Sequence, residues 1–177
     1  MKLKEIAGPE RIAEVVGRLA SEIDRDYEGR TPVLVGVLKS SFIFLSDLVR
    51  KMQTPVEIDF IRAGSYGTGC ESSGEVCIKT DLEIDVQGRD VIVVEDIVDT
   101  GFTLMAVLGH IEKKCPASLK SCALLDKPSR RKVGCAADYV GMEVPDRFVV
   151  GYGLDCAERY RGLEGLYEIR ENLPKGL

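Results

Sequence analysis

Hydrophobic and polar residues form blocks along the chain whose periods predict strands and helices in turn. Residues 32–38 and 91–94 are almost purely apolar, which is typical of strands buried on both faces of a parallel sheet. Residues 9–26 and 42–52 carry apolar side chains at helical spacing, and a third helix is expected at 102–113. Further strands are expected at 56–62 and 118–125. This alternation predicts an α/β fold with a parallel sheet and right-handed crossovers.

The remaining segments are shorter and more polar. Short strands are expected at 75–79, 139–142 and 147–152, with a last edge strand at 166–169. We expect the short strands near the chain ends, together with the first helix, to form a smaller cap. Residues 63–74 are rich in glycine and serine, and loops of this length are usually lids, binding loops or disordered.

Composition narrows the class of ligand. A chain of 177 residues with 45% apolar and 30% charged residues fits one soluble globular domain. The net charge of −5 and the pI near 5.1 oppose broad binding to nucleic acids or anionic membranes. Phosphate recognition would therefore be local, and a small phosphorylated ligand fits better than a polymer.

The amino-terminal residues 1–10 hold no apolar core of signal-peptide length, and no run approaches membrane-spanning length, so we expect a cytoplasmic protein. The chain has a single histidine and no pair of cysteines separated by two residues, so a zinc site is not expected. We expect free thiols, with disulfides possible only in an unusual cytosol. The six cysteines are Cys70, Cys77, Cys115, Cys122, Cys135 and Cys156.

Three carboxylates, Glu95, Asp96 and Asp99, follow the apolar run at 91–94. Each would cost several kcal/mol if left unpaired in an apolar interior, so we expect them to be unburied at the carboxyl end of the strand. The turn 99–103 adds hydroxyls and backbone N–H groups at a helix start, which is an anion site. A plain helix cap at Asp99 or Thr100 is the alternative, but it does not explain why Glu95 and Asp96 stand together.

The run EDIVDTG at 95–101 resembles the phosphoribosyl diphosphate motif of type I phosphoribosyltransferases, and in particular their hypoxanthine-guanine branch. The run DRFVVGYGLDCAERYR at 146–161 is a second match, far from the first in sequence. The resemblance covers about residues 33–169 and implies a five-stranded parallel core, flanked by helices, with a small hood. The whole chain, 1–177, would be one domain with its core at about 28–145 and its hood formed by the amino-terminal segment and about 146–177.

The resemblance implies a purine salvage enzyme that uses Mg²⁺. A purine nitrogen would displace pyrophosphate from the anomeric carbon of phosphoribosyl diphosphate, and hypoxanthine or guanine would yield IMP or GMP. Asp99 would act as the general base, and Glu95 and Asp96 would hold the ribose hydroxyls directly or through metal. The implied residues for phosphoribosyl diphosphate or nucleotide are Lys39, Ser40, Glu95, Asp96, Asp99, Thr100, Gly101, Phe102, Thr103 and Arg161.

The purine and metal residues are also implied by the resemblance. Lys127 would donate to the exocyclic oxygen of a 6-oxopurine, Phe148 would stack on the base, and Val149 would offer backbone groups. Asp155 would meet Mg²⁺, and Arg161 would clamp pyrophosphate. The implied purine-binding set is Lys127, Phe148, Val149 and Asp155; the metal set is Glu95, Asp96 and Asp155; the lid pair is Ser65 and Tyr66.

Each of these roles has a plainer alternative. Phe148 could be core, and Lys127 could be an exposed loop lysine beside the run 130–132, which we interpret as a solvated turn. Lys39 resembles the family's pyrophosphate loop, whose leucine-lysine peptide is often cis, but it could also be a solvated lysine before a helix. Ser40 and Ser41 stand where the family often has glycine, which leaves the conformation of this loop open. His110 is expected to be a packing or surface residue.

Two other functions fit the same fold. One is a phosphoribosyltransferase that prefers xanthine, and the other is an RNA-binding regulator, which the acidic composition opposes. The expected partners are phosphoribosyl diphosphate and a 6-oxopurine, with no nucleic acid and no membrane. We expect a homodimer or homotetramer, because symmetric assembly is the usual arrangement.

Overall fold

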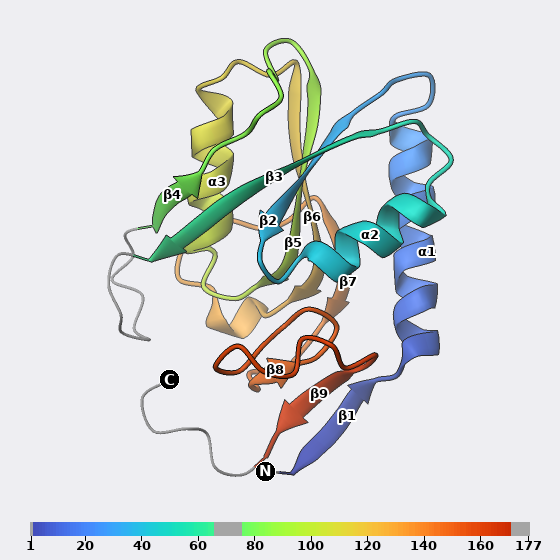
Figure 1. Cartoon of the computed structure of the whole chain (residues 1–177), viewed down its shortest axis with the longest axis vertical. Coiled ribbons are helices and arrows are strands. Elements are labelled where there is room, and N and C mark those ends of the chain that lie inside the picture. The colour runs from blue at the N-terminus through green and yellow to red at the C-terminus, as the bar shows by residue number, and fades with distance from the viewer. Residues whose placement is uncertain (1, 66–75, 171–177) are drawn as a thin grey trace.

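A six-stranded sheet forms the centre of the fold in the computed structural model, which describes residues 2–65 and 76–170 (Figure 1). The strand order is β4-β3-β2-β5-β6-β7. All neighbours from β3 to β7 pair in parallel, and only β4 is antiparallel, so the expected parallel core of five strands is confirmed. The strands are β2 (Val33–Leu38), β3 (Glu57–Ser65), β4 (Val76–Thr80), β5 (Asp90–Val98), β6 (Ser118–Asp126) and β7 (Tyr139–Glu143).

Helices cover both faces of this sheet, close to their expected ranges. They are α1 (Pro9–Asp26), α2 (Phe42–Lys51) and α3 (Phe102–Glu112). Helices α1 and α2 pack in one apolar cluster with the central strands, so the prediction that the first helix belongs to the cap is wrong. The buried apolar face of α1 packs in this cluster against the main sheet. No helix among the described residues is long and apolar enough to cross a membrane.

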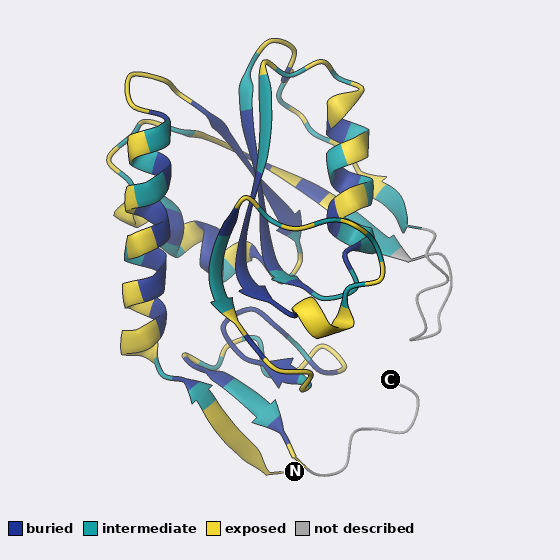
Figure 2. Cartoon of the chain, turned by 180° about the vertical axis from the view of Figure 1, so that it is seen from behind, coloured by how far each residue is buried: buried dark blue, intermediate teal, exposed yellow. Residues whose placement is uncertain are grey.

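Alternating side chains of the central strands explain why those strands are apolar throughout. Leu34 and Ile92 pack into the cluster with α1 and α2, whereas their neighbours Val33 and Val91 pack into the cluster with α3. Successive side chains of a strand point to opposite faces, so a strand covered on both sides has no polar position. The buried residues accordingly run through the middle of the sheet (Figure 2).

A second sheet joins both ends of the chain. It has three antiparallel strands in the order β1-β9-β8, with β1 at Leu3–Ala7, β8 at Val149–Val150 and β9 at Leu166–Ile169. The range of β9 is as expected, but β9 is the middle strand and not an edge, and β8 is shorter than the expected 147–152. This sheet lies beyond the carboxyl ends of the central strands (Figure 1). Apart from the packing of α1 on the main sheet, the division into a core at about 28–145 and a hood that includes about 146–177 stays a prediction.

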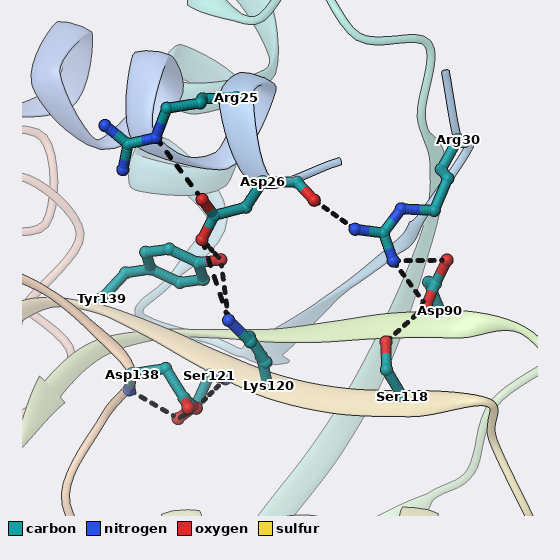
Figure 3. A network of polar contacts seen from close by, with 9 residues as sticks. All are labelled: Arg25, Asp26, Arg30, Asp90, Ser118, Lys120, Ser121, Asp138 and Tyr139. Carbon is teal, nitrogen blue, oxygen red and sulfur yellow. Dashed lines mark hydrogen bonds and ion pairs between the residues drawn. The ribbon is translucent and has the colours of Figure 1, made fainter. Parts of the chain in front are cut away.

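A network of polar contacts ties the end of α1 to the amino ends of β5 and β6 (Figure 3). The Tyr139 hydroxyl donates to Asp26 Oδ2 at 2.7 Å, and Lys120 Nζ lies 3.7 Å from the same oxygen. Ser118, which begins β6, donates to Asp90, which begins β5. Because Asp90, Ser118 and Tyr139 begin their strands, the network stabilises the amino ends of these strands, on the side of the sheet opposite to their carboxyl ends.

Candidate functional site

Strand β5 continues four residues beyond its apolar run, to Val98, and carries Glu95 and Asp96 inside the protein. Each of these residues is only 7% exposed, so the prediction that they are unburied is wrong. Burial, together with the neighbouring charge of Asp96, raises the pKa of Glu95 well above its usual value. Burial also raises the pKa of Asp96 to about 6, although two backbone N–H groups and Arg161 act in the opposite direction.

The acid pair has spare capacity for a ligand. Glu95 Oε2 is buried and has no hydrogen-bond partner among the described residues. Leaving a buried polar atom without a partner costs roughly 1–3 kcal/mol, so such an atom calls for an explanation. A hydroxyl donor or a cation beside Glu95 would satisfy it.

The bend after β5 is held from behind by the loop that follows β6. Arg131 Nη1 donates to the Asp99 carbonyl at 2.9 Å, and the Lys132 amide donates to the Thr100 carbonyl at 3.0 Å. Arg131 also pairs with Asp126. The prediction of a solvated turn is therefore wrong for Arg131, which is partly buried and positions the bend. Asp126 and Arg131 carry opposite charges and lie five positions apart, on either side of Lys127. This spacing is the sequence feature that points to a role of Arg131 in positioning the bend.

Gly101 is the N-cap residue of α3, and its φ of 89° lies in the left-handed region. A Cβ at this position would come within 2.9 Å of Val133 Cγ2. Gly101 supplies no side-chain cap, so neither Asp99 nor Thr100 caps the helix as the plainer alternative supposed. The first amides of α3 have no carbonyl acceptor within the helix, and Thr100, Phe102 and Thr103 are all partly exposed beside them. This bend can bind an anion.

Lys127 is buried directly after β6, and only 8% of its side chain is exposed. Its Nζ lies 3.6 Å from Asp99 Oδ2, and Arg130 Nε lies 3.1 Å from Asp99 Oδ1. The alternative of an exposed loop lysine is therefore wrong. Arg130 also lies 3.7 Å from Asp146, so it links the bend to the segment that leads into β8.

The loop after β2 contacts the segment 153–161. The Leu38–Lys39 peptide is cis, as the resemblance implied. Arg161 Nη1 donates to Ser40 Oγ at 2.9 Å, and Arg161 Nη2 lies 2.8 Å from Asp155 Oδ1. Arg161 Nε is buried without a partner in the part of the chain that the structure describes. The fold thus brings together Lys39, Ser40, Asp155 and Arg161, and the Arg161 Nε–H group among them is available to a ligand.

The structure says less about the remaining predicted residues. Phe148 is partly buried against Val150, Cys156 and Ile169, which is in line with its plainer alternative as a packing residue. Val149 is buried in β8. Of the lid pair, Ser65 ends β3, and Tyr66 lies outside the described residues. His110 lies on α3 and bonds Asp81 Oδ1 at 2.9 Å, as expected of a packing or surface residue.

The carboxylates fit a magnesium ion better than a metal that needs a full protein cage. No group of three or more His, Cys, Asp or Glu side chains among residues 2–65 and 76–170 is arranged to hold a metal. Mg²⁺ keeps several waters and is usually bound through one or two carboxylates and substrate phosphates. Glu95 Oε2, which has no partner among the described residues, and the adjacent Asp96 offer the one or two carboxylates that such a site uses, whereas Asp155 is paired with Arg161.

A hollow of about 680 Å³ lies elsewhere, between α1, α2 and residues 162–164. Its walls are mainly apolar, with Asp47 and Arg50 among its polar residues. It contains none of the residues discussed above. We therefore place the candidate site at the charged groups that follow the carboxyl ends of β2, β5 and β6, and not in this cavity.

Comparison with known proteins gives consistent matches. Residues 3–157 match the model of the phosphoribosyl transferase domain. The chain is 46% identical over 171 residues to a hypoxanthine-guanine phosphoribosyltransferase of Aquifex aeolicus, covering 96% of both chains. It is 50% identical over 153 residues to a hypoxanthine phosphoribosyltransferase of Salmonella typhimurium, covering 86% of this chain and 85% of that one.

Two further matches differ in extent. The chain is 48% identical over 160 residues, 90% of its length, to the bifunctional protein TilS/HprT of Listeria innocua, but it spans only 25% of that protein's length. A crystal structure of a hypoxanthine-guanine phosphoribosyltransferase from Bacillus anthracis is 46% identical and superposes with a TM-score of 0.90. That match covers 94% of this chain and 98% of the other.

Proposed function

Because the chain belongs to the phosphoribosyltransferase family, in its hypoxanthine-guanine branch, we propose that it transfers the 5-phosphoribosyl group from phosphoribosyl diphosphate to hypoxanthine or guanine. The products are IMP or GMP and pyrophosphate. The observation that carries this proposal is the buried pair Glu95 and Asp96 directly before an amide-lined bend, with one Glu95 oxygen that has no partner among the described residues.

The ribose and its phosphate occupy adjoining parts of this site. Glu95 and Asp96 accept from the two ribose hydroxyls, and their charge favours the cationic ribose that develops as the leaving group departs. The amides and hydroxyls of 99–103 hold the 5′-phosphate without a lysine, since the start of α3 supplies the donors. Arg131 keeps this bend in place through the Asp99 carbonyl.

The purine is recognised by Lys127 and deprotonated by Asp99. The Lys127 ammonium donates to the 6-oxygen of hypoxanthine or guanine and would repel the amino group of adenine. Asp99, half-exposed and 3.6 Å from that ammonium, takes the proton from the purine nitrogen as general base. Phe148 stacks on the base, and Val149 offers backbone groups to its edge.

The leaving group is held by cations. Arg161 clamps pyrophosphate with its planar guanidinium, and Lys39 and Ser40 approach it from the loop after β2. Glu95, Asp96 and Asp155 would hold Mg²⁺, which when bound supplies positive charge to the pyrophosphate. By resemblance to the family, Ser65 and Tyr66, the second of which lies outside the described residues, would belong to a lid that excludes water during transfer. The enzyme acts in the cytoplasm as a homodimer or homotetramer.

A purine specificity assay tests this function. The purified chain is incubated with phosphoribosyl diphosphate, Mg²⁺ and one purine at a time, and nucleotide and pyrophosphate are measured. We expect equal amounts of pyrophosphate and of IMP or GMP, and no AMP from adenine. Turnover of xanthine alone would change the assigned base. If the chain retained RNA on filters at physiological salt and showed no turnover, the proposed function would be wrong and an RNA-binding regulator would take its place.

A further inference from the structure

Glu158 bridges the two cations that the proposed function assigns to pyrophosphate. Its Oε1 lies 2.9 Å from Lys39 Nζ, and its Oε2 lies 3.1 Å from Arg161 Nη2. Lys39 is 119 positions away along the chain, so this carboxylate joins two separate loops. One internal anion thus occupies both partners that a diphosphate needs.

The backbone around Glu158 presents its side chain to these cations. Cys156 and Arg159 exchange two backbone hydrogen bonds of 3.1 Å, which close a two-residue turn at Ala157 and Glu158. Both turn residues have positive φ, 52° and 61°, a conformation that L-residues rarely adopt. The Glu158 amide donates to Asp155 Oδ2 at 2.8 Å, which anchors the turn beside the site. Such backbone conformations cluster at ligand-binding positions.

Glu158 lies at the protein surface and is held there by Lys39 and Arg161. Its side chain is 65% exposed, so water can solvate the carboxylate once it separates from Lys39 and Arg161. Its replacement by another anion therefore needs no rearrangement of the core.

We propose that Glu158 is an internal competitor of pyrophosphate: its carboxylate holds Lys39 and Arg161 in the free protein and is displaced from both by the diphosphate group. Since binding must break two ion pairs, Glu158 weakens the affinity for phosphoribosyl diphosphate and for pyrophosphate. It also re-forms those pairs as pyrophosphate departs, which favours release of the product. The inference rests on the proposed function, because that function places the diphosphate at Lys39 and Arg161.

Calorimetric titration with pyrophosphate and Mg²⁺ tests this without any need for turnover. Glu158→Gln removes the charge and keeps the size of the side chain. Exposed ion pairs are worth about 1.5- to 5-fold each in equilibrium constants, so we expect the loss of both pairs in Glu158→Gln to tighten the binding of pyrophosphate about 2- to 25-fold. Glu158→Ala should shift the affinity in the same direction, whereas damage to the fold would weaken it.

Glu164→Gln is the matched control. Glu164 is an exposed residue of the same segment, takes part in none of the ion pairs within the described residues, and loses the same charge. We expect its affinity for pyrophosphate to stay within twofold of the wild type. The gain from Glu158→Gln should also shrink in a Lys39→Met background, because the competition acts through that cation. In steady-state kinetics, Glu158→Gln should lower the KM for phosphoribosyl diphosphate more than it changes kcat.

The outcomes separate this inference from the function beneath it. A wild-type chain that binds pyrophosphate, with Glu158→Gln no tighter than Glu164→Gln, would overturn the role of Glu158 and leave the function intact. A wild-type chain that binds no pyrophosphate in the presence of Mg²⁺ would overturn the proposed function, and the inference with it.

Discussion

Replacing Gly153 with alanine should disturb the contact between the loop after β2 and the segment that carries Arg161. Gly153 has a φ of 102°, which only glycine adopts readily. A Cβ built on it would lie 2.1 Å from the Ser40 carbonyl oxygen. The Gly153 carbonyl also accepts from Arg161 Nη1 at 2.8 Å, so any shift of this residue reaches the guanidinium.

Two terms set the size of the effect. Holding alanine in this backbone conformation costs about 1–3 kcal/mol. Restoring the 3.0 Å separation that real Cβ contacts keep requires a displacement of about 0.9 Å between two backbone segments, and overpacking of this kind costs about 1–3 kcal/mol. We therefore expect Gly153→Ala to lower the free energy of unfolding by about 2–6 kcal/mol. For a domain of this size the Tm should fall by roughly 10 °C.

Urea unfolding and thermal unfolding measure this loss, with Gly162→Ala as the control. Gly162 lies in the same segment, and nothing lies within 4 Å of the position that an added methyl group would take, so its substitution should change stability by less than about 0.5 kcal/mol. The KM for phosphoribosyl diphosphate should rise in Gly153→Ala and not in Gly162→Ala. Equal stabilities of the two variants would refute the close approach between Gly153 and the Ser40 loop.

Three further predictions concern single side chains. Asp99→Asn should lower kcat about 10²- to 10⁴-fold in the transferase assay, and a nearly unchanged kcat would disprove its role as base. Lys127→Ala should lower kcat/KM for hypoxanthine about 100-fold and that for adenine far less; a protein that kept its preference for oxopurines would remove Lys127 from the site. Burial opposes ionisation of Asp81, but bonds from Lys114 and His110 outweigh it and lower its pKa to about 2, so its stabilising effect is present above its ordinary pKa and lost as the pH falls toward 2. Urea unfolding of Asp81→Asn should therefore show a loss of about 0.5 kcal/mol at pH 7 that shrinks between pH 4 and pH 2, and a loss independent of pH would contradict this pairing.

The apolar pattern was sufficient to predict the central sheet, because both faces of its strands are covered. Strand β5, however, continues beyond its apolar run to Val98. Carboxylates are expected to avoid an interior, but Asp96 receives two backbone N–H groups and lies near Arg161, which is distant in sequence. Such compensation depends on tertiary contacts that a local pattern does not contain.

The second sheet and the supporting residues of the site were harder to predict for the same reason. Strand β9 is central only because β1, at the other end of the chain, pairs with it, and four of the five residues of β1 are not buried. Arg131 reaches the Asp99 carbonyl from 32 positions away, and Glu158 reaches Lys39 from 119. The motifs predict which residues gather at the carboxyl ends of the strands. The partners that hold these residues in place are distant in sequence and become neighbours only in the folded chain.

The most direct test of the account is a crystal structure of the chain with bound IMP. We predict that the 5′-phosphate lies in the bend 99–103, the ribose hydroxyls contact Glu95 and Asp96, and the 6-oxygen of the base accepts from Lys127. A nucleotide bound elsewhere, with Glu95 and Asp96 free of ligand, would contradict the central claim that this acid pair and its neighbouring bend form the site of phosphoribosyl transfer.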